Sequence, residues 1–164
     1  MDFLAHLEQS GFSTWVRESR SLFAYPGILL VHTYGMALVV GLIAGIDLRI
    51  LGFAPALPLA PMRAFLPIVW VAFWINAATG TILLVADAST KMANPDFFVK
   101  MGLIVLAVIN QRLIEKRVFG DPLIDKAPLS ANARVLAAAS LVCWLGAITA
   151  GRLLAYVGPV SGLK

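Results

Sequence analysis

Few of the side chains that usually carry catalysis or bind metals occur in this chain. Its 164 residues include one cysteine, two histidines and nine aspartates and glutamates. The single cysteine, Cys143, excludes an intrachain disulfide and a metal site built on a pair of cysteines. The sequence shows no pairing of a nucleophile with a base, no phosphate-binding glycine loop and no cluster of metal ligands. We therefore expect a binding module or a subunit of a larger assembly rather than a self-contained enzyme.

Charge is scarce as well, and apolar residues take its place. Charged residues make up 13% of the chain and hydrophobic residues 60%, with a mean hydropathy of +0.86. A helix that crosses a bilayer needs about 20 mainly apolar residues. Four stretches approach or exceed this length: residues 26–51, 64–86, 97–114 and 132–157. Because short loops join them, we predict an all-α integral membrane protein with an up-down-up-down four-helix bundle.

The first 20 residues are of a different kind. Phe3, Leu4 and Leu7 fall on one helical face, away from the acidic side chains of this segment. This pattern is typical of an amphipathic helix that lies in the membrane interface. No basic start is followed by an apolar core, so we expect no cleavable signal peptide. The chain is thus divided into an interfacial segment, residues 1–20, and a transmembrane domain, residues 21–164.

The distribution of Lys and Arg predicts the orientation in the membrane. The loop between the third and fourth spans is the densest in these residues, and the positive-inside rule places it in the cytoplasm. An even number of spans then puts both termini on the non-cytoplasmic side. The isoelectric point of about 9.6 is explained by loops that face anionic lipid, and no basic patch with exposed aromatics indicates nucleic acid. The cations of the dense loop and its flanks are Arg112, Lys116, Arg117, Lys126 and Arg134.

Ionisable side chains gather at one depth of the predicted bundle. His32, the only histidine within a span, lies about 9 Å inside the non-cytoplasmic boundary at the helical rise. Lys100 and Met101 enter the third span near this depth, Arg152 returns to it in the fourth, and residues 79–81 bring the second span there. Ionisable groups within a span are costly, and they mark functional sites by default.

One interpretation of this layer is a haem site. A neutral imidazole is a common axial ligand of haem iron, and Lys100 or Arg152 would pair with the propionates of a b-type haem. The opposite ligand stays open between His6, Met101 and a second His32 across a homodimer. The predicted site consists of His32 as the iron ligand, with Lys100, Arg152 and Met101 as further cofactor-binding residues.

The same side chains allow other interpretations. With Thr79 and Thr81 they would bind a quinone headgroup or another small anionic or carbonyl-bearing molecule, or form part of a proton or ion path. Alternatively, His32 bridges two helices while Lys100 and Arg152 extend to the lipid headgroups. The first alternative predicts a ligand-binding protein. The second predicts a cofactor-free accessory or anchoring subunit of a larger membrane complex.

Other polar and small residues in the spans concern helix packing. Gly41 and Gly45 form a GxxxG motif, which permits close backbone approach within the bundle or in a homodimer. Asn76, Thr79 and Gly80 form an i, i+3, i+4 stripe that is predicted to join the second span to a neighbour. Asp47 is predicted to pair with an arginine at the cytoplasmic end, either Arg49, Arg63 or Arg112.

Several sequence features carry a family resemblance. They are Tyr25-Pro26 with His32 and Gly35, Gly41 with the segment DLRILG at residues 47–52, and NPDFFVK at residues 94–100 with Asn110. With these features the chain resembles an uncharacterised family of small bacterial inner-membrane proteins, broadly similar to the four-helix membrane cytochrome b and copper-resistance-D type bundles. The resemblance implies a haem-binding ancestry through the position of His32. The second pair of span histidines found in di-haem relatives is absent here, so the resemblance implies one haem or none.

Overall fold

The described residues of the computed structural model are 6–154 and 156, and they contain helices but no strands. The predicted face made by Phe3 and Leu4 lies outside them. In chain order the helical elements are α2 (Gly11–Glu18), α3 (Tyr25–Leu51), η1 (Ala60–Phe65), α4 (Leu66–Val85), α5 (Ala88–Met92), α6 (Pro95–Arg117) and α7 (Ala131–Leu153).

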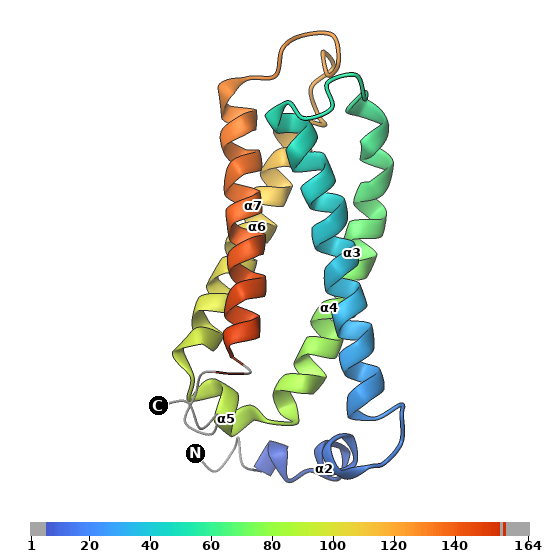
Figure 1. The fold of residues 1–164 in the computed structure, drawn as a ribbon, viewed down its shortest axis with the longest axis vertical. Coiled ribbons are helices and arrows are strands. Elements are labelled where there is room, and N and C mark those ends of the chain that lie inside the picture. The colour runs from blue at the N-terminus through green and yellow to red at the C-terminus, as the bar shows by residue number, and fades with distance from the viewer. Residues whose placement is uncertain (1–5, 155, 157–164) are drawn as a thin grey trace.

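Four helical segments are long and apolar enough to cross a membrane, which confirms the predicted fold class. The second of them combines η1 and α4, and the fourth is shorter than the predicted 132–157 because α7 ends at Leu153. Figure 1 shows the four long helices alternating in direction, with α2 and α5 together at one end of the bundle. The segments run over Tyr25–Leu51, Ala60–Val85, Pro95–Arg117 and Ala131–Leu153.

Local sequence signals set the helix starts. Pro26 lies in the first turn of α3, where its missing N–H costs little. The side chain of Asn94 accepts a hydrogen bond from the Asp96 amide at 3.0 Å and caps α6. Ser130 accepts from the Ala133 amide at 3.2 Å and caps α7. Each cap satisfies an amide that has no partner within its helix.

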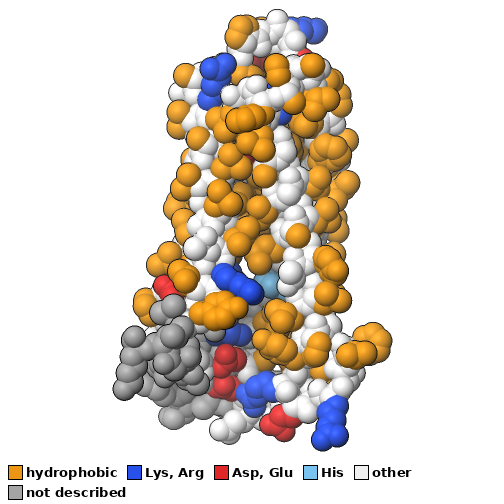
Figure 2. Space-filling model, viewed as in Figure 1, with side chains coloured by type: hydrophobic (Ala, Val, Ile, Leu, Met, Phe, Trp, Pro, Cys, Tyr) orange, Lys and Arg blue, Asp and Glu red, His pale blue; other side chains and the backbone are white. Residues whose placement is uncertain are grey.

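The long helices form two antiparallel hairpins. α3 packs along α4 and α6 packs along α7, and the contact between α3 and α7 joins the two pairs. Figure 2 shows hydrophobic side chains over the long sides of the molecule and charged side chains concentrated near its two ends. An apolar wall between polar ends is the surface that a bilayer requires of a multi-pass protein.

The core is concentrated in one half of the bundle. All buried residues of α3 lie between Val39 and Ile50, and those of α6 lie between Ala107 and Ile114. This half adjoins the loop between α6 and α7. Toward α2 the helices diverge in Figure 1, and the first halves of α3 and α6 bury none of their side chains. The two hairpins therefore pack together in one half of the bundle, the packed half, and diverge in the other, the open half, where α4 and α7 still bury Leu83 and Ala150.

Two loops are joined at the packed end. The carboxylate of Asp125 accepts hydrogen bonds from the amides of Leu59 and Ala60, both at 2.7 Å. Arg49 lies 3.9 Å from the same carboxylate and donates to the carbonyl oxygens of Leu57 and Pro55. These bonds tie the loop after α3 and the start of η1 to the loop between α6 and α7.

The predicted ion pair of Asp47 is wrong. Asp47 is fully buried, and neither carboxylate oxygen has a hydrogen-bond partner among the described residues. The physical reason is direction, because Asp47 faces the core from α3 while the arginines face other ways. Arg49 lies half-buried near the end of α3, Arg63 is exposed in η1 and Arg112 is exposed on α6. They bind elsewhere: Arg49 to Asp125, Arg112 to Glu115 at 3.1 Å, and Arg63 to the Phe119 carbonyl oxygen at 3.5 Å.

The N-terminal helix α2 is attached to the end of α4. Ser13 donates to the Val85 carbonyl oxygen at 3.3 Å, and Arg17 donates to that of Ala86 at 3.0 Å. These carbonyls end α4 and have no partner within it. On its other side α2 exposes Phe12 and Trp15, whose rings stack with centres 6.3 Å apart. α2 thus has one bound face and one apolar exposed face, as an interfacial helix needs.

Candidate functional site

His32 and Asn76 hold α3 and α4 together by reciprocal hydrogen bonds. His32 Nδ1 lies 3.0 Å from the Asn76 carbonyl oxygen and 3.1 Å from the Thr79 hydroxyl. In return, the side-chain amide of Asn76 donates to the His32 carbonyl oxygen. His32, the histidine of the predicted site, therefore makes a definite contact with α4, and its side chain is half-buried between two helices.

These contacts assign the proton on the imidazole. A carbonyl oxygen only accepts, so Nδ1 must carry the hydrogen that it shares with Asn76. The Thr79 hydroxyl lies 2.9 Å from the Ile75 carbonyl oxygen, to which it donates, so its own oxygen is free to accept from Nδ1. In the neutral ring the lone pair is then on Nε2. This is the nitrogen with which His32 can bind a metal or accept a hydrogen bond.

Two glycines allow the helices to come this close. A methyl group on Gly80 would lie 2.9 Å from His32 Cε1, and one on Gly35 would lie 3.4 Å from Asn76 Cβ. Gly80 therefore provides the space that the imidazole ring occupies. Together with Asn76 and Thr79 it forms the predicted stripe, whose role in joining helices is confirmed.

Two of the predicted cations lie at the same end of the bundle, in different settings. Lys100 is half-buried and packs along α7, where a methyl group on Gly151 would lie 3.3 Å from Cε and 3.4 Å from Nζ. Its charge acts on the His32 ring. Arg152 is exposed, and its guanidinium carbon lies 5.2 Å from the centre of the Tyr156 ring. Lys100 is thus the predicted cation that the structure associates with His32.

A further cation, Lys91, was not among the predicted site residues. Its side chain donates to the Leu83 carbonyl oxygen, lies 3.9 Å from the Asp87 carboxylate, and also acts on His32 through its charge. Burial lowers the pKa of Lys91, while the Asp87 charge raises it in part. It lies in α5, a short helix between the spans, so a search confined to the spans could not find it.

The remaining candidates do not converge on the histidine. Met101 is 43% exposed, and His6 is exposed on the N-terminal segment. Thr81 donates to the Ala77 carbonyl oxygen of its own helix. Among the described residues, no group of three or more His, Cys, Asp or Glu side chains could hold a metal ion. In the part of the chain that the structure describes, none of these candidates is therefore oriented toward His32.

The site lies in the open half of the bundle. His32 precedes the buried part of α3, and Lys100 precedes that of α6. In Figure 2, histidine atoms are recessed among hydrophobic side chains in this half, beside a Lys or Arg side chain.

A second polar contact joins α4 and α6 in the packed half. Trp70 Nε1 donates to Glu115 at 2.6 Å, and the Arg112 guanidinium lies 3.8 Å above the Trp70 ring and 3.1 Å from Glu115. The sequence offered a partial signal in the i, i+3 spacing of Arg112 and Glu115. It did not indicate their partner on α4, because that contact depends on how the hairpins meet.

Comparison of this chain with protein-family models, curated proteins and solved structures finds no match.

Proposed function

We propose that this chain is a haem-binding subunit of the bacterial inner membrane, in which His32 is an axial ligand of one b-type haem. The observation that carries the proposal is the hydrogen bond from His32 Nδ1 to the Asn76 carbonyl oxygen. Histidines that bind metals almost always donate their other ring N–H to such a group, which fixes the tautomer and the ring orientation. A haem bound there would supply one-electron transfer.

The cations near His32 support an acidic cofactor. Lys100 and Lys91 both act on the imidazole through their charges. Arg152 is exposed in the last turn of α7, at the same end of the bundle. Propionates are the acidic groups of a haem, and cations bind carboxylates by charge-assisted hydrogen bonds. In this proposal Lys100 holds a propionate near the membrane boundary, while the exposed Arg152 is free to bind the other.

The opposite axial ligand is proposed to be Met101 or His6 of the same chain rather than His32 of a second copy. At 100° per residue, Gly41 lies on the side of α3 opposite to His32. Methyl groups on Gly41 and Gly45 would meet nothing within 4 Å, so the bundle itself does not use the GxxxG face. A homodimer formed through this face would hold its two His32 side chains apart.

The proposal is tested by reduced-minus-oxidised absorption spectra of protein purified in mild detergent from a haem-replete host. We expect a b-type band in the wild type and its loss in His32→Ala. Met101→Leu and His6→Ala separate the two candidates for the opposite ligand, and Met62→Leu, in the packed half, is the matched control. A wild-type spectrum without a haem band, at good yield, would contradict the proposal.

A second candidate is a cofactor-free accessory subunit, and the reciprocal contact between His32 and Asn76 favours it. That contact satisfies Nδ1 and joins two helices without any ligand. A colourless protein that co-purifies with a membrane complex would support this candidate. A quinone or similar ligand would instead give a His32→Ala variant with weaker ligand binding and unchanged absorbance.

We also propose an orientation with both termini outside the cytoplasm. The Lys and Arg side chains at the end of α6, in the loop after it and at the start of α7 support it, since basic segments beside the spans stay in the cytoplasm. They are Arg112, Lys116, Arg117, Lys126 and Arg134.

A further inference from the structure

A second group of polar side chains is buried in the packed half of the bundle. Asp47 and Ser140 are 0% exposed, Gln111 is 2% exposed and Trp144 is 7% exposed. Both oxygens of Asp47, the Ser140 hydroxyl, both amide atoms of Gln111 and the indole nitrogen of Trp144 lack hydrogen-bond partners among the described residues. Buried polar atoms are nearly always paired, so a cluster without partners requires an explanation.

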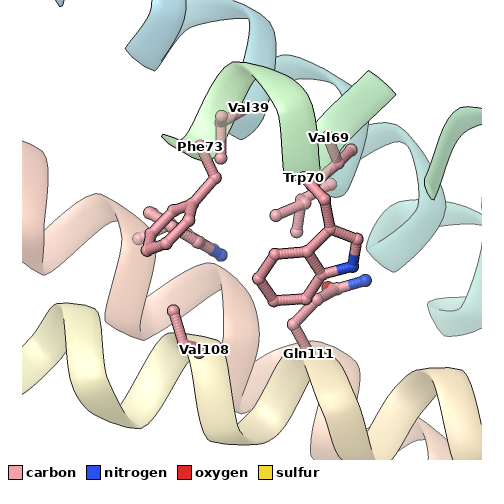
Figure 3. Close-up of a pocket in the computed structure, with 8 residues that line it drawn as sticks. Val39, Val69, Trp70, Phe73, Val108 and Gln111 are labelled. Atoms are coloured by element: carbon pink, nitrogen blue, oxygen red, sulfur yellow. The ribbon is translucent and has the colours of Figure 1, made fainter. Parts of the chain in front are cut away.

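These side chains come from three helices and meet in one region. The Ser140 hydroxyl of α7 acts on the Asp47 carboxyl of α3, although the two do not reach hydrogen-bond geometry. Ile43, one turn from Asp47, and Trp144, one turn from Ser140, line the same small cavity as Gln111 of α6. Figure 3 shows Gln111 beside the Trp70 ring at this cavity. Its volume is about 10 Å³, about the minimum that admits one water molecule.

Among the residues that the structure describes, no positive side chain neutralises Asp47. The described elements packed against α3 bring Ser140 from α7 to the carboxyl, and no described Lys, Arg or His lies within ion-pair distance of it. An ionised carboxylate without a partner is very costly in an apolar interior, where buried charges are paired or are neutralised by a proton. The nearest arginines are engaged with Asp125, Glu115 and the Phe119 carbonyl oxygen.

We propose that Asp47 is a proton-binding site in the core of the bundle, with Ser140 as its hydrogen-bond partner. A proton from water forms an O–H bond with one carboxylate oxygen and cancels the charge of the carboxylate. The new O–H then donates to the Ser140 hydroxyl oxygen, across the contact between α3 and α7. Loss of the proton returns an unpaired negative charge to this contact, so proton binding is coupled to the packing of the two hairpins.

This site is separate from the proposed haem site. Asp47 lies in the packed half, whereas His32 lies in the open half. Failure of one proposal therefore leaves the other standing.

The test is infrared spectroscopy of the carboxylic-acid carbonyl stretch in protein reconstituted in lipid, titrated over the pH range in which it stays folded. We expect a one-proton carboxyl signal in the wild type that is absent from Asp47→Asn. Asp96→Asn, which changes a carboxylate at the start of α6, should retain it. Because Asn has the shape of the protonated acid, the Asp47→Asn bundle should fold. If it does not fold, Ser140→Ala tests the same hydrogen bond, because the frequency of the carboxyl band should then shift from that of the wild type.

Two outcomes would overturn the proposal. One is an identical carboxyl spectrum for the wild type and Asp47→Asn at every pH. The other is an Asp47 carboxylate that stays ionised, together with a stabilising effect of sodium. In that case, replacing choline with sodium at constant ionic strength would raise the melting temperature of the wild type but not that of Asp47→Asn. The second result would assign the site to a metal cation.

Discussion

Gly80 leaves the space in which the His32 imidazole lies, since a methyl group on its α-carbon would be 2.9 Å from Cε1. Both the haem-binding and the cofactor-free candidates depend on this close approach of α3 and α4. The contact can be tested without knowledge of any ligand.

Gly80→Ala should destabilise the bundle. The added methyl group must displace either the imidazole or the backbone of α4, and overpacking of this kind costs about 1–3 kcal/mol. The measurement is the free energy of unfolding in mixed micelles with increasing denaturing detergent. Gly102→Ala is the control, because a methyl group there meets nothing within 4 Å. Equal stability of the two variants would show that the ring moves away without cost.

His32 and Thr79 should be energetically coupled. His32 Nδ1 lies 3.1 Å from the Thr79 hydroxyl in a contact between the two side chains, so removal of one side chain also removes much of the effect of the other. In a double-mutant cycle of His32→Ala and Thr79→Ala, we expect a coupling free energy of about 1 kcal/mol, within the range for hydrogen bonds between membrane helices. The control is His32→Ala with Thr81→Ala, because Thr81 bonds to its own helix. Additive effects in the first cycle would contradict the contact between His32 and Thr79.

Asp125 should make the stability of the packed end depend on acid pH. The amides of Ala60 and Leu59 lower the pKa of this carboxyl below its usual value. Since the pKa is lower in the folded state than in the unfolded state, the stabilisation is present above the unfolded value and is lost as pH falls through the folded value. The advantage in melting temperature of the wild type over Asp125→Asn should therefore shrink between about pH 5 and about pH 2.

The matched control for acid dependence is Asp121→Asn in the same loop, whose carboxylate accepts from the Leu123 amide at 2.8 Å within its own turn. The acid dependence would not be due to Asp125 if the difference in melting temperature between the wild type and Asp125→Asn persisted unchanged in acid. The same would hold if Asp121→Asn gave the same difference.

Labelling of single cysteines should report the orientation. In a Cys143→Ser background, Arg20→Cys and Lys126→Cys place a thiol at exposed positions on opposite ends of the bundle. With a membrane-impermeant maleimide on intact cells, we expect Arg20→Cys to react and Lys126→Cys to react only after permeabilisation. The reverse pattern would place the loop between α6 and α7 outside the cytoplasm.

The parts of the fold that depend on local sequence could be predicted. Apolar length located the four spans, and prolines and capping side chains lie at the starts of three of them. The stripe of Asn76, Thr79 and Gly80 was recognised as a helix contact from its spacing alone. These signals work because helix propensity, capping and membrane insertion are decided within a few turns of chain.

Features that depend on contacts between distant segments could not be predicted. Asp125 binds amides more than 60 residues away. Asp47 was assigned to an arginine because the sequence shows nearby charges but not the direction in which a side chain points. The attachment of α2 to α4 and the partner of Nδ1 likewise follow from tertiary packing.

The uneven distribution of the core has a mechanical consequence. With the buried residues of α3 and α6 at one end, each hairpin would tilt as a unit about the packed half, since His32 and Asn76 hold α3 to α4. From Val39 back to Tyr25 α3 is about 21 Å long, so a tilt of about 10° about the packed half moves its free end by about 4 Å. Side chains remote from His32 therefore affect how far the two hairpins diverge at its depth. A change of charge at Asp47 occurs in the packed half, where a small displacement produces a larger one at the other end.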